Sequence, residues 1–394
     1  MTEHTDTLIH AAPEMSRLRL GFVALTDCAP LVVAKELMLG QLYGLQIELQ
    51  RQPSWAAVRD KLLTGELDAA HCLYGLVYGV QLGLGGPQAD LAILMTLNRN
   101  GQAISLSNRL SDAIQNGATL GDAFSSLGRK PVLAQTFPTG THAMWLNYWL
   151  ASQGVHPLRD VESVVIPPPQ MADAMAQGEL DGFCAGEPWH TVTMARQAGR
   201  MIISSGAIWP NHPEKALACR RDFAALYPNT ARALIRTLLD ACKWLETPAN
   251  RKTAAHWLAG AEYLNLAPDL IVPSLGLPAS HSPDLHALSA ASAKAGPALR
   301  FFDEHGLNAP RPADGLWFLS QYCRWGMLKP QSGLQSDWQS IAQTVSQTTL
   351  FQEAAAAMRP PVEESAYPLC RMIDGVEWQG LDPVGYGESF PIRA

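Results

Sequence analysis

Basic residues are too few in this sequence to predict a nucleic-acid surface. The 394-residue chain has 29 Lys and Arg against 36 Asp and Glu, a formal charge of −7, whereas a nucleic-acid-binding domain normally carries a basic stripe. The net sign does not exclude small anions, because a local pocket need not follow it. Apolar runs of about eighteen residues are also missing, so no transmembrane helix is predicted.

Motifs of metal, cofactor and nucleophile chemistry are missing as well. The seven cysteines are scattered, odd in number and without a CxxC pair, which favours reduced thiols over a disulfide or zinc framework. The sequence contains no HExxH, no phosphate-binding loop and no GxGxxG, and it supports no Ser–His–Asp arrangement. We therefore expect no metal, no cofactor and no enzymatic activity.

The N-terminal segment lacks the features of a secretory signal. It reads MTEHTDTLIHAAPEMSR, with acidic residues at Glu3, Asp6 and Glu14 and without a basic start, a long apolar run or a lipobox cysteine. Together with the scattered cysteines, this predicts a cytoplasmic protein. A signal encoded upstream of this start would change that expectation.

One phrase is present twice, as GELDAAH at 65–71 and as GELDGFC at 178–184. Each copy follows a helix-like run, and its glycine is the residue type that accepts a left-handed turn after a helix. The Leu-Asp that follows opens a short apolar stretch typical of a buried strand. We interpret the repeat as the matching turns of two similar lobes, which a chain of this length also favours. Such a turn can also recur by chance in an α/β protein.

Strand-like and helix-like segments alternate through the first half of the chain. The strand patterns lie at 18–25, 43–50, 91–107, 130–137 and 163–169. This alternation predicts the α/β class, with parallel-rich sheets and right-handed crossovers. Beyond residue 216 the pattern is mostly helical, and the Pro- and Gly-rich end predicts an irregular surface wrap. We assign 17–105 plus 216–394 to the first lobe and 106–215 to the second.

Ligands of open α/β sheets bind beyond the carboxyl ends of strands, so the loops there supply the candidate site. Gln102 follows an Asn-Gly turn, Trp55 begins a helix, and His142 lies in the first turn of another helix, where N–H groups suit an anion. Gly186 lets the backbone approach a ligand, and Lys215 follows two prolines on an expected rigid loop. Three of them have an ordinary alternative: Trp55 packs in the core, and His142 and Lys215 are surface side chains.

Six ordered stretches resemble the nitrate-binding proteins of bacterial nitrate and bicarbonate ABC importers. They read LTDCAPLVVAKE, SWAAVRDKLLTGELDAAH, QTFPTGTHAMWLNYWL, VVIPPPQM, GELDGFCAGEPW and IWPNHPEKAL, and the similarity runs from about residue 17 to at least residue 360. The resemblance implies a two-lobed periplasmic-binding-protein fold of type II, with the anion in a central cleft. It places the nitrate contacts on Trp55, Gln102, His142, the backbone of Gly186, and Lys215.

The resemblance also implies a mechanism and a partner. In bicarbonate-specific members an acidic residue replaces the lysine and works with calcium, so Lys215 favours nitrate or nitrite and implies no metal. We expect Trp55 and Gln102 to come from the first lobe and His142 and Gly186 from the second. Without a signal segment the chain is most similar to the cytoplasmic nitrate/nitrite sensors of the family. Such a sensor sequesters an RNA-binding antiterminator, a NasT-like protein of the ANTAR type, and releases it when nitrate closes the cleft. It contacts neither nucleic acid nor membrane directly.

Three alternatives stay open. The chain can be the substrate-binding component of a nitrate/nitrite ABC importer, which has the same fold and site. It can be an enzyme, because pyrimidine-precursor synthases of thiamin biosynthesis share the fold, but those need pyridoxal phosphate and a reactive Cys or Lys. The ligand can be nitrite, cyanate or a sulfonate, because sequence spacing does not separate nitrate from nitrite, both flat and singly charged.

Overall fold

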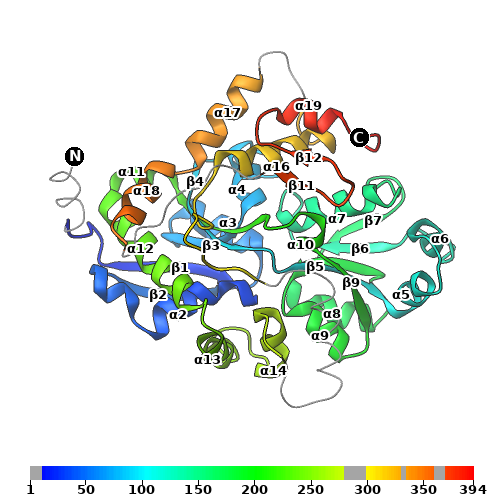
Figure 1. Ribbon diagram of the computed structural model, residues 1–394, viewed down its shortest axis with the longest axis horizontal. Coiled ribbons are helices and arrows are strands. Elements are labelled where there is room, and N and C mark those ends of the chain that lie inside the picture. Colours follow the sequence, from blue (N-terminus) through cyan, green and yellow to red (C-terminus); the bar gives the residue numbers. More distant parts are fainter. Residues whose placement is uncertain (1–10, 279–298, 330–333, 359–368) are drawn as a thin grey trace.

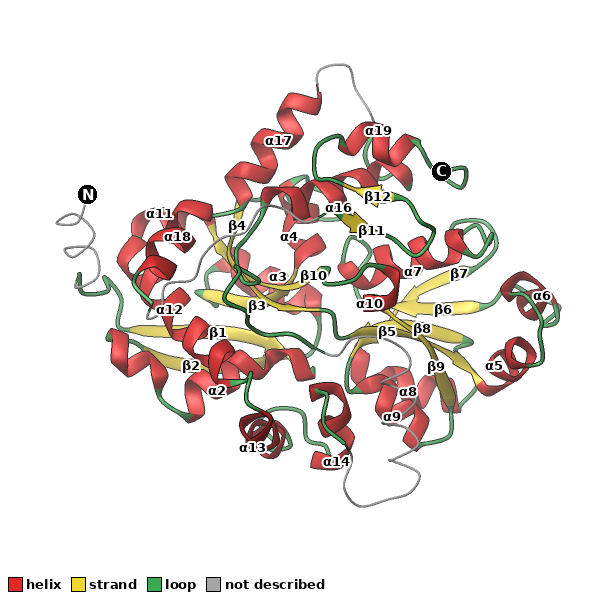
Figure 2. Ribbon diagram, viewed as in Figure 1, coloured by secondary structure: helices red, strands yellow, loops and turns green. Residues whose placement is uncertain are grey.

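Two five-stranded sheets lie side by side in the computed structural model, which describes residues 11–278, 299–329, 334–358 and 369–394 (Figure 1). Helices cover both sheets (Figure 2). Among the described residues, no helix is long and apolar enough to cross a membrane. The predicted α/β class with two lobes is confirmed, and we call each sheet with its helices a lobe.

The first sheet has the strand order β2-β1-β3-β10-β4. Its strands are β1 (Arg17–Val23), β2 (Gln46–Gln52), β3 (Ala69–Leu73), β4 (Leu91–Arg99) and β10 (Pro213–Arg220). β1 pairs in parallel with β2 and β3, whereas β10 is antiparallel to both of its neighbours. The sheet is therefore mixed instead of predominantly parallel.

The second sheet repeats this plan in the order β7-β6-β8-β5-β9. Its strands are β5 (Gln102–Ser107), β6 (Val132–Gln135), β7 (Glu162–Val165), β8 (Gly182–Gly186) and β9 (Gly199–Ser204). β6 is parallel to β7 and β8, and β5 is antiparallel to β8 and β9. Strand by strand, the two orders and directions correspond.

The repeated GELD phrase occupies equivalent places in the two lobes. Gly65 and Gly178 both have positive φ, of 78° and 76°, and each lies at the end of a helix. The strands that follow, β3 and β8, are the third strand of their sheets. The interpretation of the repeat as matching turns of two lobes is confirmed.

Helices connect the strands and extend the first lobe. Those of the first half are α2 (Ala29–Glu36), α3 (Trp55–Thr64), α4 (Tyr74–Gln81), α5 (Asn108–Gln115), α6 (Leu120–Ser125), α7 (Thr141–Ser152), α8 (Pro168–Ala176), α9 (Trp189–Ala195) and α10 (Ser205–Ile208). Those of the second half are α11 (Arg221–Leu226), α12 (Pro228–Trp244), α13 (Pro248–Leu258), α14 (Pro268–Ile271), α16 (Pro312–Arg324), α17 (Leu334–Val345), α18 (Thr348–Ala356) and α19 (Pro383–Glu388). Short 3-10 helices are η1 (Thr26–Cys28), η2 (Leu39–Tyr43) and η3 (Val272–Leu275).

Between β1 and β10 the chain changes sheets twice, once between β4 and β5 and once between β9 and β10. The predicted lobe boundaries, after residues 105 and 215, lie inside β5 and β10. Because the apolar pattern runs almost without a break from 91 to 107, periodicity alone did not show that β4 and β5 belong to different sheets.

The C-terminal part of the chain contacts both lobes, although the prediction assigned it to the first. The Tyr322 hydroxyl of α16 lies 2.5 Å from the carbonyl oxygen of Gly75 in the first lobe and 2.8 Å from that of Thr139 in the second. The Tyr148 hydroxyl of α7 donates to Asp374, between the short strands β11 (Cys370–Arg371) and β12 (Glu377–Trp378). The predicted surface wrap is thus a small hairpin and helix where it is described, and 279–298 and 359–368 lie outside the described residues.

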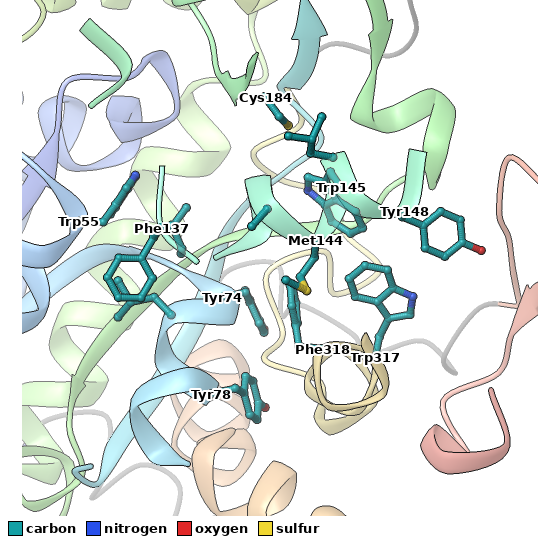
Figure 3. Packing of buried hydrophobic residues seen from close by; sticks show 14 of the residues in the cluster. Trp55, Tyr74, Tyr78, Phe137, Met144, Trp145, Tyr148, Cys184, Trp317 and Phe318 are labelled. Atoms are coloured by element: carbon teal, nitrogen blue, oxygen red, sulfur yellow. The ribbon is translucent and has the colours of Figure 1, made fainter. Parts of the chain in front are cut away.

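An aromatic cluster joins α7 and α16. Trp145 packs against Trp317 at 4.6 Å between ring centroids, and Phe318 and Tyr148 lie beside this pair (Figure 3). Such buried aromatic contacts contribute large apolar areas. They fix the N-terminal end of α7, which supplies part of the candidate site.

Candidate anion-binding site

The five predicted ligand positions lie where the two lobes meet. Trp55 begins α3, Gln102 begins β5, and His142 is the second residue of α7. Gly186 ends β8, and Lys215 lies in β10. The four side chains other than glycine are at most 1% exposed, so the surface alternatives for His142 and Lys215 are excluded.

Short contacts connect these positions. His142 Nε2 lies 2.6 Å from Gln102 Oε1, and the pairing of β5 with β8 places Gln102 opposite Gly186. Lys215 Nζ lies 5.6 Å from the centroid of the Trp55 ring. A Cβ atom at Gly186 would lie 2.9 Å from Gln102 Oε1, so glycine leaves room for the amide. The structure brings all five positions together, and their role as ligands stays a prediction.

Two placements differ from what the sequence predicted. Gln102 belongs to the second sheet, so the first lobe contributes Trp55 and Lys215 and the second contributes Gln102, His142 and Gly186. Lys215 lies within a strand and not on a rigid loop. The prolines at 210 and 213 suggested a loop, but Pro213 is the first residue of β10, where a missing N–H is tolerated.

Asp27 is a central residue of the site that the sequence did not reveal. Its Oδ2 accepts hydrogen bonds from Lys215 Nζ at 2.7 Å and Gln102 Nε2 at 3.1 Å, and its Oδ1 lies 2.7 Å from His71 Nε2. It lies in η1 before α2, a position typical of a helix cap, but neither helix has a side-chain cap. A carboxyl group directly after the first buried strand is the signal that could have identified it.

Glu214 is the second such residue. Its Oε1 accepts hydrogen bonds from Lys215 Nζ at 2.8 Å and Thr141 Oγ1 at 2.7 Å, and its Oε2 accepts one from Trp145 Nε1 at 3.1 Å. The pairing of β10 with β4 shifts register at this point, and such bulges redirect side chains. Glu214 and Lys215 can therefore meet although they are consecutive in a strand, and a carboxylate of the protein itself faces the start of α7.

Burial and pairing determine the charges of these groups. Burial lowers the pKa of Lys215, but Asp27 and Glu214 together raise it above its ordinary value. Burial raises the pKa of Asp27, but Lys215 and His71 lower it well below its usual range. Burial raises the pKa of Glu214, and Lys215 offsets this only in part. Burial and the nearby ammonium of Lys215 lower the pKa of His142 far below its ordinary value, so this ring is neutral.

The hydrogen-bond network assigns one tautomer to the neutral His142 ring. Gln102 Nε2 donates to Asp27, which leaves Gln102 Oε1 as an acceptor for His142 Nε2–H. His142 Nδ1 then accepts from the Thr136 hydroxyl. A continuous chain of hydrogen bonds therefore runs from the second lobe through Gln102 and Asp27 to Lys215 in the first.

Main-chain contacts hold the lobes together beside this network. The N–H of Thr26 donates to the carbonyl oxygen of Glu187 at 2.8 Å. The Trp189 indole N–H donates to the carbonyl oxygen of Ala24 at 2.9 Å. The segment between β1 and α2 is thus attached to the turn between β8 and α9, so the site lies at an interface that both lobes must form.

A cavity of about 210 Å³ extends along this interface next to Trp55. Its walls include Arg59 and Leu84 of the first lobe and Phe137 and Pro167 of the second. Of the five predicted positions, Trp55 is the one that lines this cavity, and its ring also lies near Lys215.

The arrangement contains groups that can hold an anion and also two carboxylates that compete with one. The ammonium group of Lys215 contacts Asp27 and Glu214, and the indole Nε1 of Trp55 is buried without a hydrogen-bond partner among the described residues. Within those residues, no group of three or more His, Cys, Asp and Glu side chains is placed to hold a metal ion. Burial raises the pKa of the nearby Cys72 thiol to about 12 and that of Cys184 well above its ordinary value, which disfavours either thiol as a nucleophile.

Comparisons of the sequence and of the structure with known proteins agree on one family. Residues 11–259 match the model of the NMT1-like family. The chain is 32% identical over 406 residues to the nitrate/nitrite binding protein NrtA of Synechocystis sp., covering 97% of this chain and 86% of NrtA. The crystal structure of the periplasmic nitrate-binding protein NrtA from Synechocystis PCC 6803 superposes with a TM-score of 0.85 at 30% identity, covering 97% of this chain and all of that one.

Two longer proteins are similar over the same length. The nitrate import ATP-binding protein NrtC of Synechocystis sp. is 34% identical over 388 residues, and the bicarbonate transport ATP-binding protein CmpC of Synechococcus elongatus is 33% identical over 389 residues. Each alignment covers 96% of this chain, but the chain spans only 56% of NrtC and of CmpC. The similarity to both therefore concerns one part of a larger protein.

Proposed function

Because the chain belongs to the NMT1-like family, within the group of nitrate-binding substrate-binding proteins, we propose that it binds nitrate or nitrite in the cleft between its lobes. The proposed contacts are Trp55, Gln102, His142, the backbone of Gly186, and Lys215. The observation that carries the proposal is the buried ammonium group of Lys215 where the lobes meet, beside the Trp55 ring and linked through Asp27 to Gln102 and His142 of the opposite lobe.

The physical properties of nitrate fit these groups. Nitrate is flat, carries one charge and accepts hydrogen bonds without donating any, so its site needs one cation, several N–H groups and an aromatic face. Micromolar affinity corresponds to about 8 kcal/mol. A single charge-assisted hydrogen bond contributes roughly 1.5–3 kcal/mol, so several donors must converge. Lys215, the amide of Gln102 and Trp55 Nε1 are the candidates, and His142 Nε2 joins them if its hydrogen bond to Gln102 is exchanged for one to the anion.

Isothermal titration calorimetry with nitrate, nitrite, sulfate and hydrogen carbonate tests the proposal. We expect saturable binding of nitrate or nitrite, weaker binding of sulfate, and no requirement for calcium. Lys215→Met is expected to weaken nitrate binding at least 100-fold, whereas Lys61→Met on the exposed side of α3 leaves it unchanged. If neither nitrate nor nitrite binds the unmodified protein, the proposal is wrong.

For the biological role, we propose a nitrate/nitrite sensor of the NasS type that acts in the cytoplasm. In this proposal the ligand-free protein sequesters a NasT-like antiterminator of the ANTAR type and releases it when nitrate binds. The described cysteines form no disulfide bond, and Cys323 is only partly buried, which suits a reducing compartment. Release of the partner requires that nitrate and the partner weaken each other's binding by the same factor.

The competing role is that of a substrate-binding component of a nitrate/nitrite importer. It is favoured by the likeness to NrtA and NrtC, whose names describe nitrate binding and import. A pull-down of the protein from lysate of its own cells, with and without millimolar nitrate, separates the two roles. A small regulator that co-purifies only without nitrate supports the sensor. If no regulator co-purifies in either condition while nitrate binds tightly, the importer role is the better one.

A further inference from the structure

Lys215 is held between two buried carboxylates. Its Nζ lies 2.7 Å from Asp27 Oδ2 and 2.8 Å from Glu214 Oε1, and all three side chains are at most 1% exposed. When both carboxylates are ionised, this group carries one positive and two negative charges. The cation that should attract the ligand is then more than neutralised by the protein itself.

We infer that the site takes up its anion together with one proton, which is carried by Glu214. This inference rests on the proposed binding of nitrate or nitrite, and it makes Glu214 a residue that determines which anions bind. Nitrate has no hydrogen to donate, so an ionised Glu214 both repels it and competes with it for the ammonium of Lys215. A protonated Glu214 releases Lys215 in part and can itself donate a hydrogen bond.

The other acidic group, Asp27, is a poorer carrier of the proton. Both carboxyl groups accept from three donors, and both are bonded across the lobes, so the number of donors does not separate them. The difference lies at one oxygen of each. Asp27 Oδ1 lies 2.7 Å from His71 Nε2, whereas the hydrogen bond from Trp145 to Glu214 Oε2 is longer, at 3.1 Å, so Glu214 Oε2 is the better place for an added proton. The pKa directions agree, because that of Asp27 is lowered while that of Glu214 is raised by burial.

None of the other titratable groups around Glu214 is a better carrier of the added proton. Those that face it are Lys215 beside it on β10, His212 before that strand, His142 on α7 and Cys184 on β8. His142 already uses both ring nitrogens in hydrogen bonds, and His212 is bonded through its ring to Pro213 and Ser205. Burial lowers the pKa of His212 to about 3, which disfavours an added proton on that ring.

The inference defines a class of ligand. Acceptor-only monovalent oxyanions such as nitrate and nitrite should bind with a proton from solution. An anion that carries its own hydrogen, such as hydrogen carbonate, can donate to an ionised Glu214 and should need none. A divalent acceptor-only anion such as sulfate would need a second proton. The group next in line is His71 beside Asp27, whose Nδ1 has no hydrogen-bond partner among the described residues but whose pKa is lowered by burial, so sulfate should bind more weakly.

Calorimetry in several buffers counts the protons directly. Nitrate is titrated into the full-length protein at pH 8 in buffers with different enthalpies of ionisation, and the slope of the observed enthalpy gives the protons taken up. We expect a slope of about one at pH 8, and a slope that falls together with a rise in nitrate affinity as the pH is lowered. If nitrate binds with a slope of zero at every pH from 5 to 9, the inference is wrong while the proposed function stands. If no nitrate binds, the proposed function itself has failed.

Two variants assign the proton to Glu214. Glu214→Gln should bind nitrate with a slope near zero and with an affinity that no longer varies between pH 6 and pH 8. Proton uptake that persists in this variant overturns the assignment.

A second variant, Thr141→Val, tests the same point if the first folds poorly. It removes a donor to the ionised carboxylate of Glu214, so the fall in nitrate affinity with rising pH should occur at a higher pH. Glu179→Gln, which removes an exposed carboxyl group of the second GELD phrase, is the matched control and should keep the slope of the unmodified protein.

Discussion

Lys215 and Asp27 form a buried ion pair, with 2.7 Å between Nζ and Oδ2, and the same oxygen accepts a hydrogen bond from Gln102 of the opposite lobe. A buried pair of this kind is not by itself evidence of high stability, because desolvation of both charges opposes their attraction. Its position is more informative. The contact joins η1 and β10 of the first lobe to β5 of the second, so charge pairing and the meeting of the lobes depend on each other.

The first prediction concerns the removal of this cation. Lys215→Met leaves Asp27 and Glu214 buried without their shared partner, and breaking a buried pair on one side destabilises a protein by about 3–5 kcal/mol. We expect a loss of this size at pH 8 in urea unfolding. The loss should be smaller for Lys215→Met combined with Asp27→Asn and Glu214→Gln, because no buried charge then remains unpaired. A triple variant less stable than the single one would contradict this account.

The second prediction tests the close approach of the lobes at α4. A Cβ atom at Gly79 would lie 2.2 Å from Thr139 Oγ1 and 2.7 Å from Thr139 Cβ, in the loop before α7. Gly79→Ala should therefore hold the lobes apart, with nitrate affinity reduced at least 10-fold and a larger radius of gyration in small-angle scattering.

The control for Gly79→Ala is Gly121→Ala in α6, where the nearest atom to an added Cβ would be 3.9 Å away. Gly121→Ala should leave the nitrate affinity and the radius of gyration unchanged. Because alanine is a better helix former than glycine, the substitution should raise the free energy of unfolding slightly. An unchanged radius and affinity in Gly79→Ala would show that the contact with Thr139 does not limit closure.

Much of the site could be predicted from the sequence, because the strand ends and the resemblance point to the same loops. Trp55, His142 and Lys215 lie together as expected. Asp27 and Glu214 could not be identified in the same way, since each has an ordinary local interpretation, a helix cap for one and a solvated acid for the other. Their real environment depends on tertiary structure: the bulge in β10 redirects Glu214, and the pairing of the two lobes brings Gln102 to Asp27.

The lobe assignment of Gln102 was wrong for a related reason. An Asn-Gly turn predicts that a chain changes direction, but it does not say which sheet the next strand joins. Here the turn at Asn100 and Gly101 separates β4 from β5, which lie in different sheets. Only long-range strand pairing, of β5 with β8, decides the assignment.

The third prediction concerns the side chain of Glu187, whose main-chain carbonyl oxygen accepts a hydrogen bond from the N–H of Thr26. Burial raises the pKa of this carboxyl to about 7 from an ordinary 4.5, and hydrogen bonds from Thr191 offset the shift only in part. The folded state binds this proton more tightly than the unfolded state does, so protonation of Glu187 stabilises the fold. This contribution to the free energy of unfolding is fully present below about pH 4.5 and is lost as the pH rises through about 7. The change amounts to roughly 3 kcal/mol.

Urea unfolding at several pH values measures this effect. Glu187→Gln should flatten the decline in the free energy of unfolding between pH 5 and pH 8 relative to the unmodified protein, whereas Glu162→Gln, at an exposed position, should not. Equal slopes for both variants would show that Glu187 is not the group responsible.

The fourth prediction returns to the two glycines of the repeated phrase. Both have left-handed backbone, which costs a residue with a Cβ about 1–2 kcal/mol. A Cβ at Gly178 would meet no atom within 4 Å, so Gly178→Ala should lose only this amount in urea unfolding. A Cβ at Gly65 would lie 2.5 Å from Nη1 of Arg220, a flexible side chain end that can move away. Gly65→Ala should therefore cost the same amount or slightly more, and a loss several kcal/mol larger than that of Gly178→Ala would mean that the two turns are not equivalent.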